Sequence, residues 1–283
     1  MTIQTHHTAP TQFVEANGIR FAYRRFGRKG VVPLVFNQHF TGTMDHWDPA
    51  VTDGLAQDRE VILFNNAGIS SSTGEVPTNF AATGANAIAF IRALGLRQVD
   101  VLGFSIGGFV AQEITLQAPE LVRRLVLVGT GPRGGEGMGP LTPEAQEIFS
   151  ASYDPPENIW LRALFTPSEA SQAAGRAFLE RMLSRKNNRD PEVNDKVGPA
   201  QIQAIAEFAV KPSSYAYLKE IKQPTLVVNG DHDVICYPIN SWVLQQNLPN
   251  AQLIIYPDAG HGSQDQYHER FVRHVSAFLS ETA

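Results

Sequence analysis

Residues 99–108 read Val-Asp-Val-Leu-Gly-Phe-Ser-Ile-Gly-Gly, and this stretch decides the fold. The apolar run 99–102 has the length of a buried strand, and residues 107–117 follow a helical pattern. Between them stands Gly-Phe-Ser-Ile-Gly, the G-x-S-x-G pattern of a sharp strand-to-helix turn. Side chains at Gly103 and Gly107 would collide with the adjoining elements, so glycine is expected at both positions. The stretch therefore predicts a strand, a tight turn that presents Ser105, and a helix.

The rest of the chain repeats this alternation of strand and helix. Residues 12–26 read as two strands around Asn17-Gly18, a strong hairpin signal. Six further short apolar runs are predicted strands: Leu34–Phe36, Val61–Phe64, Val99–Leu102, Leu125–Val128, Leu226–Val228 and Leu253–Tyr256. Helical patterns lie between several of them, at Ala81–Leu94, Gly107–Gln117, Ile239–Leu248 and Gln266–Leu279. The pattern predicts an α/β fold in which a mostly parallel, eight-stranded sheet has helices on both faces.

One interval interrupts this alternation. Residues 132–218 contain no convincing strand and consist of helix-like segments separated by prolines. Connections in α/β units are ordinarily about 2–6 residues long, so we expect a helical cap here. The predicted division is a core domain of residues 1–131 and 219–283, with the cap at 132–218. Trp160, Phe165, Phe178, Met182 and Phe208 could line a pocket under this cap or form the cap's own core.

Composition excludes several classes of protein. The 283 residues are 43% hydrophobic and 18% charged, with a formal net charge of −5 and no basic run, which disfavours nucleic-acid binding. With a single cysteine, Cys236, no disulfide within the chain is possible. No signal-peptide pattern or apolar run of ~20 residues is present, so we expect a cytoplasmic protein with no membrane partner. We see no metal-ligand spacing and no phosphate-binding glycine loop, so neither a metal nor an organic cofactor is expected.

A serine hydroxyl needs a general base, and that base needs a group to orient it. His261 is the candidate base, because it follows the last apolar run and has glycines on both sides. Asp231 and Asp233 both follow the run Leu226–Val228, and their charge alone does not separate them as the third group. We expect His6 and His7 to lie in a frayed N-terminal tail.

These residues resemble the α/β-hydrolase superfamily over nearly the whole chain. The resemblance implies the α/β-hydrolase fold with a cap and a triad of nucleophile, acid and histidine. Members commonly show Gly-x-x-Asp ahead of a proline, and here Gly230 to Asp233 leads to Pro238. The resemblance therefore favours Asp233 as the acid beside Ser105 and His261.

The same resemblance implies an oxyanion hole made of backbone N–H groups. The family's loop after the third strand usually reads His-Gly-x-x-Gly, and here residues 38–42 read Gln-His-Phe-Thr-Gly. The implied donors are the N–H groups of Phe40 and Ile106. Gln38 and His39 depart from the pattern, and backbone donors tolerate such side-chain changes. His39 could bind substrate or be a hydrogen-bonded loop residue.

These expectations describe a serine hydrolase that cleaves a carboxylic ester or lactone, a small molecule with an acyl group, through an acyl-enzyme on Ser105. Two other reactions could use the same triad: cofactor-free haloperoxidase-like perhydrolysis and hydrolytic carbon–carbon cleavage. A third hypothesis is a non-enzymatic binding protein on the same scaffold. Epoxide hydrolases and haloalkane dehalogenases of this fold attack with aspartate, so Ser105 disfavours both.

Overall fold

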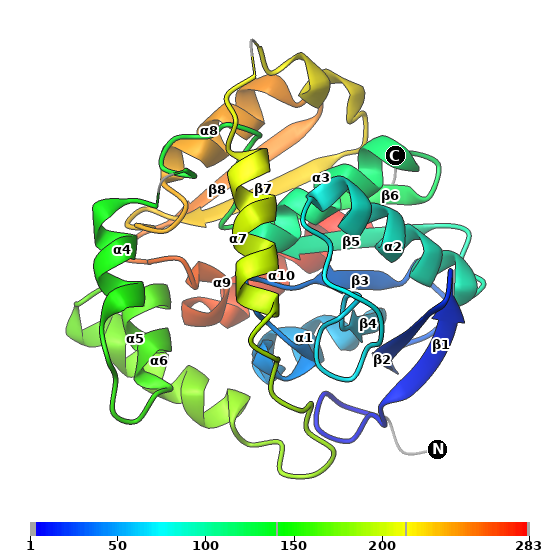
Figure 1. Ribbon diagram of the computed structural model, residues 1–283, viewed down its shortest axis with the longest axis horizontal. Coiled ribbons are helices and arrows are strands. Elements are labelled where there is room, and N and C mark those ends of the chain that lie inside the picture. The colour runs from blue at the N-terminus through cyan, green and yellow to red at the C-terminus, as the bar shows by residue number, and fades with distance from the viewer. Residues whose placement is uncertain (1–3, 140, 213, 282–283) are drawn as a thin grey trace.

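The computed structural model describes residues 4–139, 141–212 and 214–281 of the chain. Within them, eight strands form one sheet in the order β1-β2-β4-β3-β5-β6-β7-β8 (Figure 1). β1 pairs antiparallel with β2 and β2 antiparallel with β4, and all other neighbours are parallel. The strands are β1 (Gln12–Ala16), β2 (Ile19–Gly27), β3 (Leu34–Asn37), β4 (Glu60–Phe64), β5 (Val99–Phe104), β6 (Val122–Val128), β7 (Thr225–Gly230) and β8 (Ala251–Tyr256). The prediction of a mostly parallel eight-stranded sheet is confirmed.

Successive side chains along each buried strand point to opposite faces of the sheet, so the interior contains two apolar clusters, one on each face. On β3, Val35 belongs to one cluster and Leu34 and Phe36 belong to the other. The first cluster packs against α2 (Phe80–Ala93), α3 (Ile106–Gln117) and α8 (Pro238–Asn247), and the second against α1 (Pro49–Ala56) and α10 (His268–Ser280). α1 lies outside the helices predicted from sequence; its N-cap is Asp48, whose side chain accepts the Ala50 N–H.

The strand order reverses direction at β3, which lies between β4 and β5. Asn37 at the end of β3 is in register with Gly103 near the end of β5. The loop that follows β3 and the turn that follows β5 therefore leave the sheet side by side. Such a switch point at the carboxyl ends of parallel strands is where open α/β sheets place their ligand sites.

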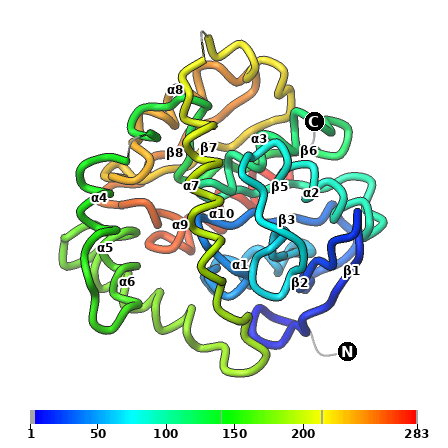
Figure 2. Tube along the Cα trace, in the orientation of Figure 1, coloured from blue at the N-terminus to red at the C-terminus, as the bar shows by residue number. Residues whose placement is uncertain are grey.

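The long connection between β6 and β7 is helical in its described part. It contains α4 (Pro143–Ser150), α5 (Asn158–Leu164), α6 (Glu169–Met182), α7 (Val197–Phe208) and the 3₁₀ helix η2 (Ala216–Glu220). Figures 1 and 2 show α7 crossing the front of the molecule, with α4, α5 and α6 to its left. We call residues 132–218 the insertion; its separation as a cap domain stays a prediction. No helix in the described residues is long and apolar enough to cross a membrane.

Buried ion pairs tie the insertion to the sheet domain. Arg181 of α6 donates two hydrogen bonds, of 2.9 Å and 2.6 Å, to the two carboxylate oxygens of Asp48. Asp45 accepts from the fully buried Arg24 and from the backbone N–H of Asp190, in the segment between α6 and α7. Because buried charges are costly unless they are paired, these contacts fix where the insertion sits.

The expectation that His6 lies in a frayed tail is wrong. Its side chain is buried, its Nδ1 lies 2.9 Å from the Thr52 hydroxyl, and its backbone N–H donates to Asp53. Arg185 of the insertion donates to the His6 carbonyl. The N-terminal segment is therefore held between α1 and the insertion.

Burial lowers the pKa of His6 from 6.5 to about 3. Between pH 6.5 and 3, His6 binds a proton in the unfolded chain but not in the folded chain. Its contribution to the free energy of unfolding is therefore complete above pH 6.5. That contribution is lost as the pH falls toward 3, by up to ~1.4 kcal/mol for each pH unit. We predict that His6→Gln lowers the free energy of unfolding at pH 7 and makes it less dependent on pH between 6.5 and 4. Urea unfolding at several pH values checks this prediction. An unchanged slope of the unfolding free energy against pH would contradict it.

Candidate active site

Ser105 lies in the sharp turn between β5 and α3, as the sequence predicts. Its backbone has φ 57° and ψ −124°, an unfavourable region for a residue with a side chain. A Cβ at Gly103 would lie 2.2 Å from the Gly107 carbonyl oxygen, and a Cβ at Gly107 would lie 2.1 Å from that of Asn37. Only glycine fits these two positions, which bring the start of α3 against β3. The Ser105 hydroxyl consequently stands at the N-terminal end of α3, where developing negative charge is favoured.

His261 and Asp233 are in direct contact. His261 Nδ1 lies 2.8 Å from Asp233 Oδ2, and both side chains are buried. Asp233 Oδ1 accepts the backbone N–H groups of Ile235 and Cys236, each at 2.9 Å. The carboxylate is therefore fixed by one oxygen and holds the imidazole with the other, which leaves His261 Nε2 as the proton acceptor.

Asp231 occupies a different environment. It lies 2.6 Å from the exposed His232 ring and accepts the Ala259 N–H at 3.2 Å. Of the two acids that follow β7, the structure places only Asp233 on His261.

The His261 ring lies close to the turn that carries Ser105. Phe104 precedes the serine, and its ring centroid is 4.9 Å from that of His261. Among the described residues, no hydrogen bond joins the Ser105 hydroxyl to the imidazole. Hydrogen bonds between nucleophile and base are often formed or tightened only when substrate binds, so the arrangement remains compatible with proton transfer.

The loop after β3 contains one free N–H at the expected position. His39 N–H donates to Gln38 Oε1 at 2.9 Å, Thr41 N–H to Gln201 Oε1 at 2.7 Å, and Gly42 N–H to the His39 carbonyl at 3.0 Å. The Phe40 N–H has no acceptor within the described ranges. Ile106, the first residue of α3, has no acceptor for its N–H inside that helix. Both implied oxyanion donors are available for a ligand.

Two neutral histidines and a tryptophan pack beside this loop. The His39 ring stacks on His46 at 5.7 Å and lies 5.1 Å from Trp160 of α5. Burial lowers the pKa of His39 to about 3 and that of His46 to about 4. His39 Nδ1 lies 2.9 Å from the Phe40 carbonyl oxygen, so His39 is a hydrogen-bonded loop residue as well as a neighbour of the site.

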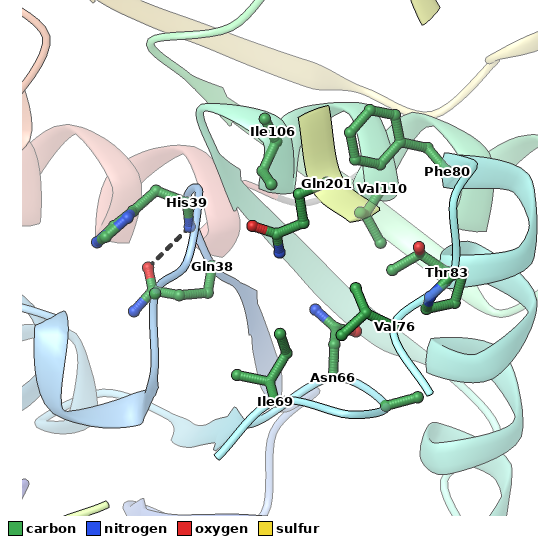
Figure 3. Close-up of a pocket in the computed structure, with 13 residues that line it drawn as sticks. Gln38, His39, Asn66, Ile69, Val76, Phe80, Thr83, Ile106, Val110 and Gln201 are labelled. Atoms are coloured by element: carbon green, nitrogen blue, oxygen red, sulfur yellow. Dashed lines mark hydrogen bonds between the residues drawn. The ribbon is translucent and has the colours of Figure 1, made fainter. Parts of the chain in front are cut away.

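A small pocket of about 20 Å³ adjoins α3 and residues 38–42, which we call the oxyanion loop after its expected role (Figure 3). That volume is close to the room that one or two water molecules occupy. Its walls are neutral: three carboxamides, a threonine hydroxyl, the uncharged His39 and apolar side chains. The lining residues are Gln38, His39, Gly42, Asn66, Ala67, Ile69, Val76, Pro77, Phe80, Thr83, Ile106, Val110 and Gln201.

Most of the aromatic residues singled out in the insertion are buried in the two apolar clusters that it shares with the sheet. Phe165 and Phe178 pack on each other at 5.7 Å, Met182 is buried in the same cluster, and Phe208 stacks on Phe109 of α3. Trp160 is the member of that set that adjoins the oxyanion loop. His46 and Gln201 were missed by sequence reasoning, because neither forms a motif.

The loop that carries His261 is also held by the insertion. The Gly262 N–H donates to the Leu164 carbonyl at the end of α5, at 2.8 Å.

Within the described residues, no group of three or more histidine, cysteine or acidic side chains is placed to hold a metal ion.

Comparison with known proteins agrees with this architecture. A protein of the alpha/beta hydrolase fold from Chitinophaga pinensis superposes with a TM-score of 0.92 and is 39% identical, covering 99% of this chain and 100% of that one. A 2-hydroxymuconate semialdehyde hydrolase from Pseudomonas putida is 29% identical over 69% of this chain and 67% of its own length. A pimeloyl-[acyl-carrier protein] methyl ester esterase from Nitrosomonas europaea is 31% identical over 61% of this chain and 68% of its own length. The family model described as alpha/beta hydrolase fold matches residues 32–266, and the chain belongs to this family.

Proposed function

We propose that the protein is a serine hydrolase that cleaves a neutral carboxylic ester or lactone. The observation that carries the proposal is the buried contact of His261 with Asp233 beside a serine in a strained turn. Strain at a residue with a side chain is characteristic of functional sites. A buried carboxylate on a histidine is the arrangement that prepares an imidazole to accept a proton.

The proposed reaction has two stages. His261 Nε2 takes the Ser105 proton as the serine oxygen attacks the ester carbonyl, and the oxyanion is stabilised by the N–H groups of Phe40 and Ile106. The alcohol leaves with the proton from His261, and an acyl-enzyme remains on Ser105. Water then loses a proton to His261 as it attacks the acyl-enzyme, and the acid leaves as His261 returns that proton to the Ser105 oxygen.

The small pocket is lined by His39 and Ile106, the neighbours of Phe40 and Ser105, so its walls bear on the charge of the substrate. The two curated relatives are named for different substrates, one a methyl ester and the other a semialdehyde that carries a carboxylate. A carboxylate in a buried site needs a cationic partner. The pocket walls contain no lysine or arginine, and burial keeps His39 neutral. We therefore favour a neutral ester over carbon–carbon cleavage of an acidic substrate.

The first test is covalent labelling by a fluorophosphonate probe, which reacts with an activated serine. We predict that the wild-type protein is labelled and hydrolyses p-nitrophenyl acetate, and that Ser105→Ala does neither. Intact-mass measurement counts the label, and Ser263→Ala is the matched control because it removes another buried hydroxyl near His261. Equal labelling of wild type and Ser105→Ala would exclude Ser105 as the nucleophile. No labelling of the wild type would favour the binding-protein hypothesis.

Asp233→Asn is predicted to reduce kcat by roughly ten-thousandfold, the size of this change in a serine protease, because an amide no longer selects the useful imidazole tautomer. Asp231→Asn, the matched control, is predicted to leave kcat close to the wild-type value. Ester hydrolysis by both variants, with thermal unfolding to confirm folding, checks this pair. Equal losses of kcat in Asp233→Asn and Asp231→Asn would contradict the assignment of Asp233, and not Asp231, as the acid that orients His261.

A matched pair of substrates tests the neutral pocket. We predict a higher kcat/KM for p-nitrophenyl butyrate than for the p-nitrophenyl monoester of succinic acid, because the second places a carboxylate against walls without a cation. The chains are of similar length, so charge is the main difference. An equal or higher kcat/KM for the succinyl ester would contradict the assignment of a neutral acyl group.

A further inference from the structure

Helix α7 of the insertion touches the loop that carries the proposed oxyanion donor Phe40. Gln201 Oε1 accepts the Thr41 N–H at 2.7 Å. Gly198 lies one turn earlier on the same side of the helix, where a Cβ would be 3.9 Å from Phe40 Cζ. Figure 3 shows Gln201 reaching from α7 toward the oxyanion loop and Asn66.

The other end of α7 is anchored on the helix that carries the second donor. Phe208, the last residue of α7, stacks on Phe109 of α3 with ring centroids 4.2 Å apart and planes at 18°. It also contacts Phe80 edge-on at 5.6 Å. Since α3 begins at Ile106, α7 spans the distance between the two elements that supply the N–H groups.

Thr41 adopts a backbone conformation that is unfavourable by itself. Its φ is 52°, in the left-handed region that residues with side chains rarely occupy. The hydrogen bonds of His39 N–H and Gly42 N–H are made inside the loop, whereas that of Thr41 N–H is made to the insertion. Gln201 therefore supplies an external constraint at the residue next to Phe40.

We propose that Gln201 is a positioning residue for the oxyanion hole: by holding Thr41, it directs the Phe40 N–H toward the oxygen that becomes negatively charged. The insertion then contributes to the chemical step and does not only enclose substrate. This inference rests on the proposed ester hydrolysis. It assigns to Gln201, which also lines the small pocket, an action through the backbone of Thr41 and not through contact with the reacting atoms.

A positioning role, a substrate-binding role and a purely structural role for Gln201 predict different changes in kcat and KM when its side chain is replaced. The oxyanion exists only in the transition state and the tetrahedral intermediate, so loss of its alignment lowers kcat and leaves KM nearly unchanged. A side chain that bound substrate directly would raise KM when removed. A purely structural side chain would lower the amount of folded enzyme without changing turnover per active site.

The experiment compares Gln201→Met, Gln201→Asn and Gln203→Met. Methionine keeps the length of glutamine without its carbonyl acceptor, and asparagine keeps the carboxamide on a side chain too short to reach Thr41. Gln203 is exposed on the same helix, so Gln203→Met is the matched control. Endpoint labelling with the fluorophosphonate counts competent sites, and kcat and KM for p-nitrophenyl acetate are expressed per labelled site.

We expect kcat to fall about tenfold in both Gln201 variants, a part of the ~100- to 1000-fold cost of removing an oxyanion donor. KM should stay near the wild-type value, and Gln203→Met should match wild type. Unchanged kcat per site in Gln201→Met, or a raised KM with unchanged kcat, would overturn the role of Gln201 and leave the ester hydrolase standing. An unlabelled, inactive wild type would instead refute the proposed function itself.

Discussion

The approach of α3 to the end of β3 leaves no space for side chains, and the geometry of the candidate site depends on that contact. The Gly107 backbone lies so close to the Asn37 carbonyl that a Cβ would be 2.1 Å from its oxygen. The chain can turn this sharply only if Ser105 accepts a positive φ, at a cost of order 1–3 kcal/mol. The hydrogen bond from Ser105 N–H to the Val128 carbonyl on β6, at 2.9 Å, helps to hold the strained residue in place. The same contact brings the oxyanion loop beside the serine.

The polar groups around this turn have specific hydrogen-bond partners. Asp233 uses one oxygen to accept two backbone N–H groups and the other to hold His261. Asp231 is held elsewhere, by the His232 ring and the Ala259 N–H, and makes no hydrogen bond to His261 among the described residues. Burial keeps His39 and His46 uncharged, so neither adds a positive charge beside the imidazole of His261. The proposed oxyanion donors are backbone groups, and backbone donors are compatible with glutamine and histidine at positions 38 and 39.

Short-range sequence patterns predicted the features that depend only on neighbouring residues in the chain. The β5–α3 turn follows from glycine spacing and the sheet from short apolar runs, and the structure confirms the fold. The assignment of Asp233 needed the family resemblance, because Asp231 and Asp233 have the same charge and differ only in how the loop turns. His6 and Gln201 escaped prediction for another reason: their partners are 46 and 160 positions away in the chain. A polar residue in a tail or on a helix reads as exposed until the fold supplies its partner.

The insertion holds both loops on which the proposed chemistry depends. Leu164 at the end of α5 accepts the N–H of Gly262, next to His261, and Gln201 on α7 accepts the N–H of Thr41, next to Phe40. Ser105 is 6% exposed and His261 5% exposed. Each of these two hydrogen bonds joins a loop of the sheet domain to the insertion, and each is made by the backbone N–H next to a residue of the proposed chemistry. Any change in the position of the insertion would therefore act on both loops together.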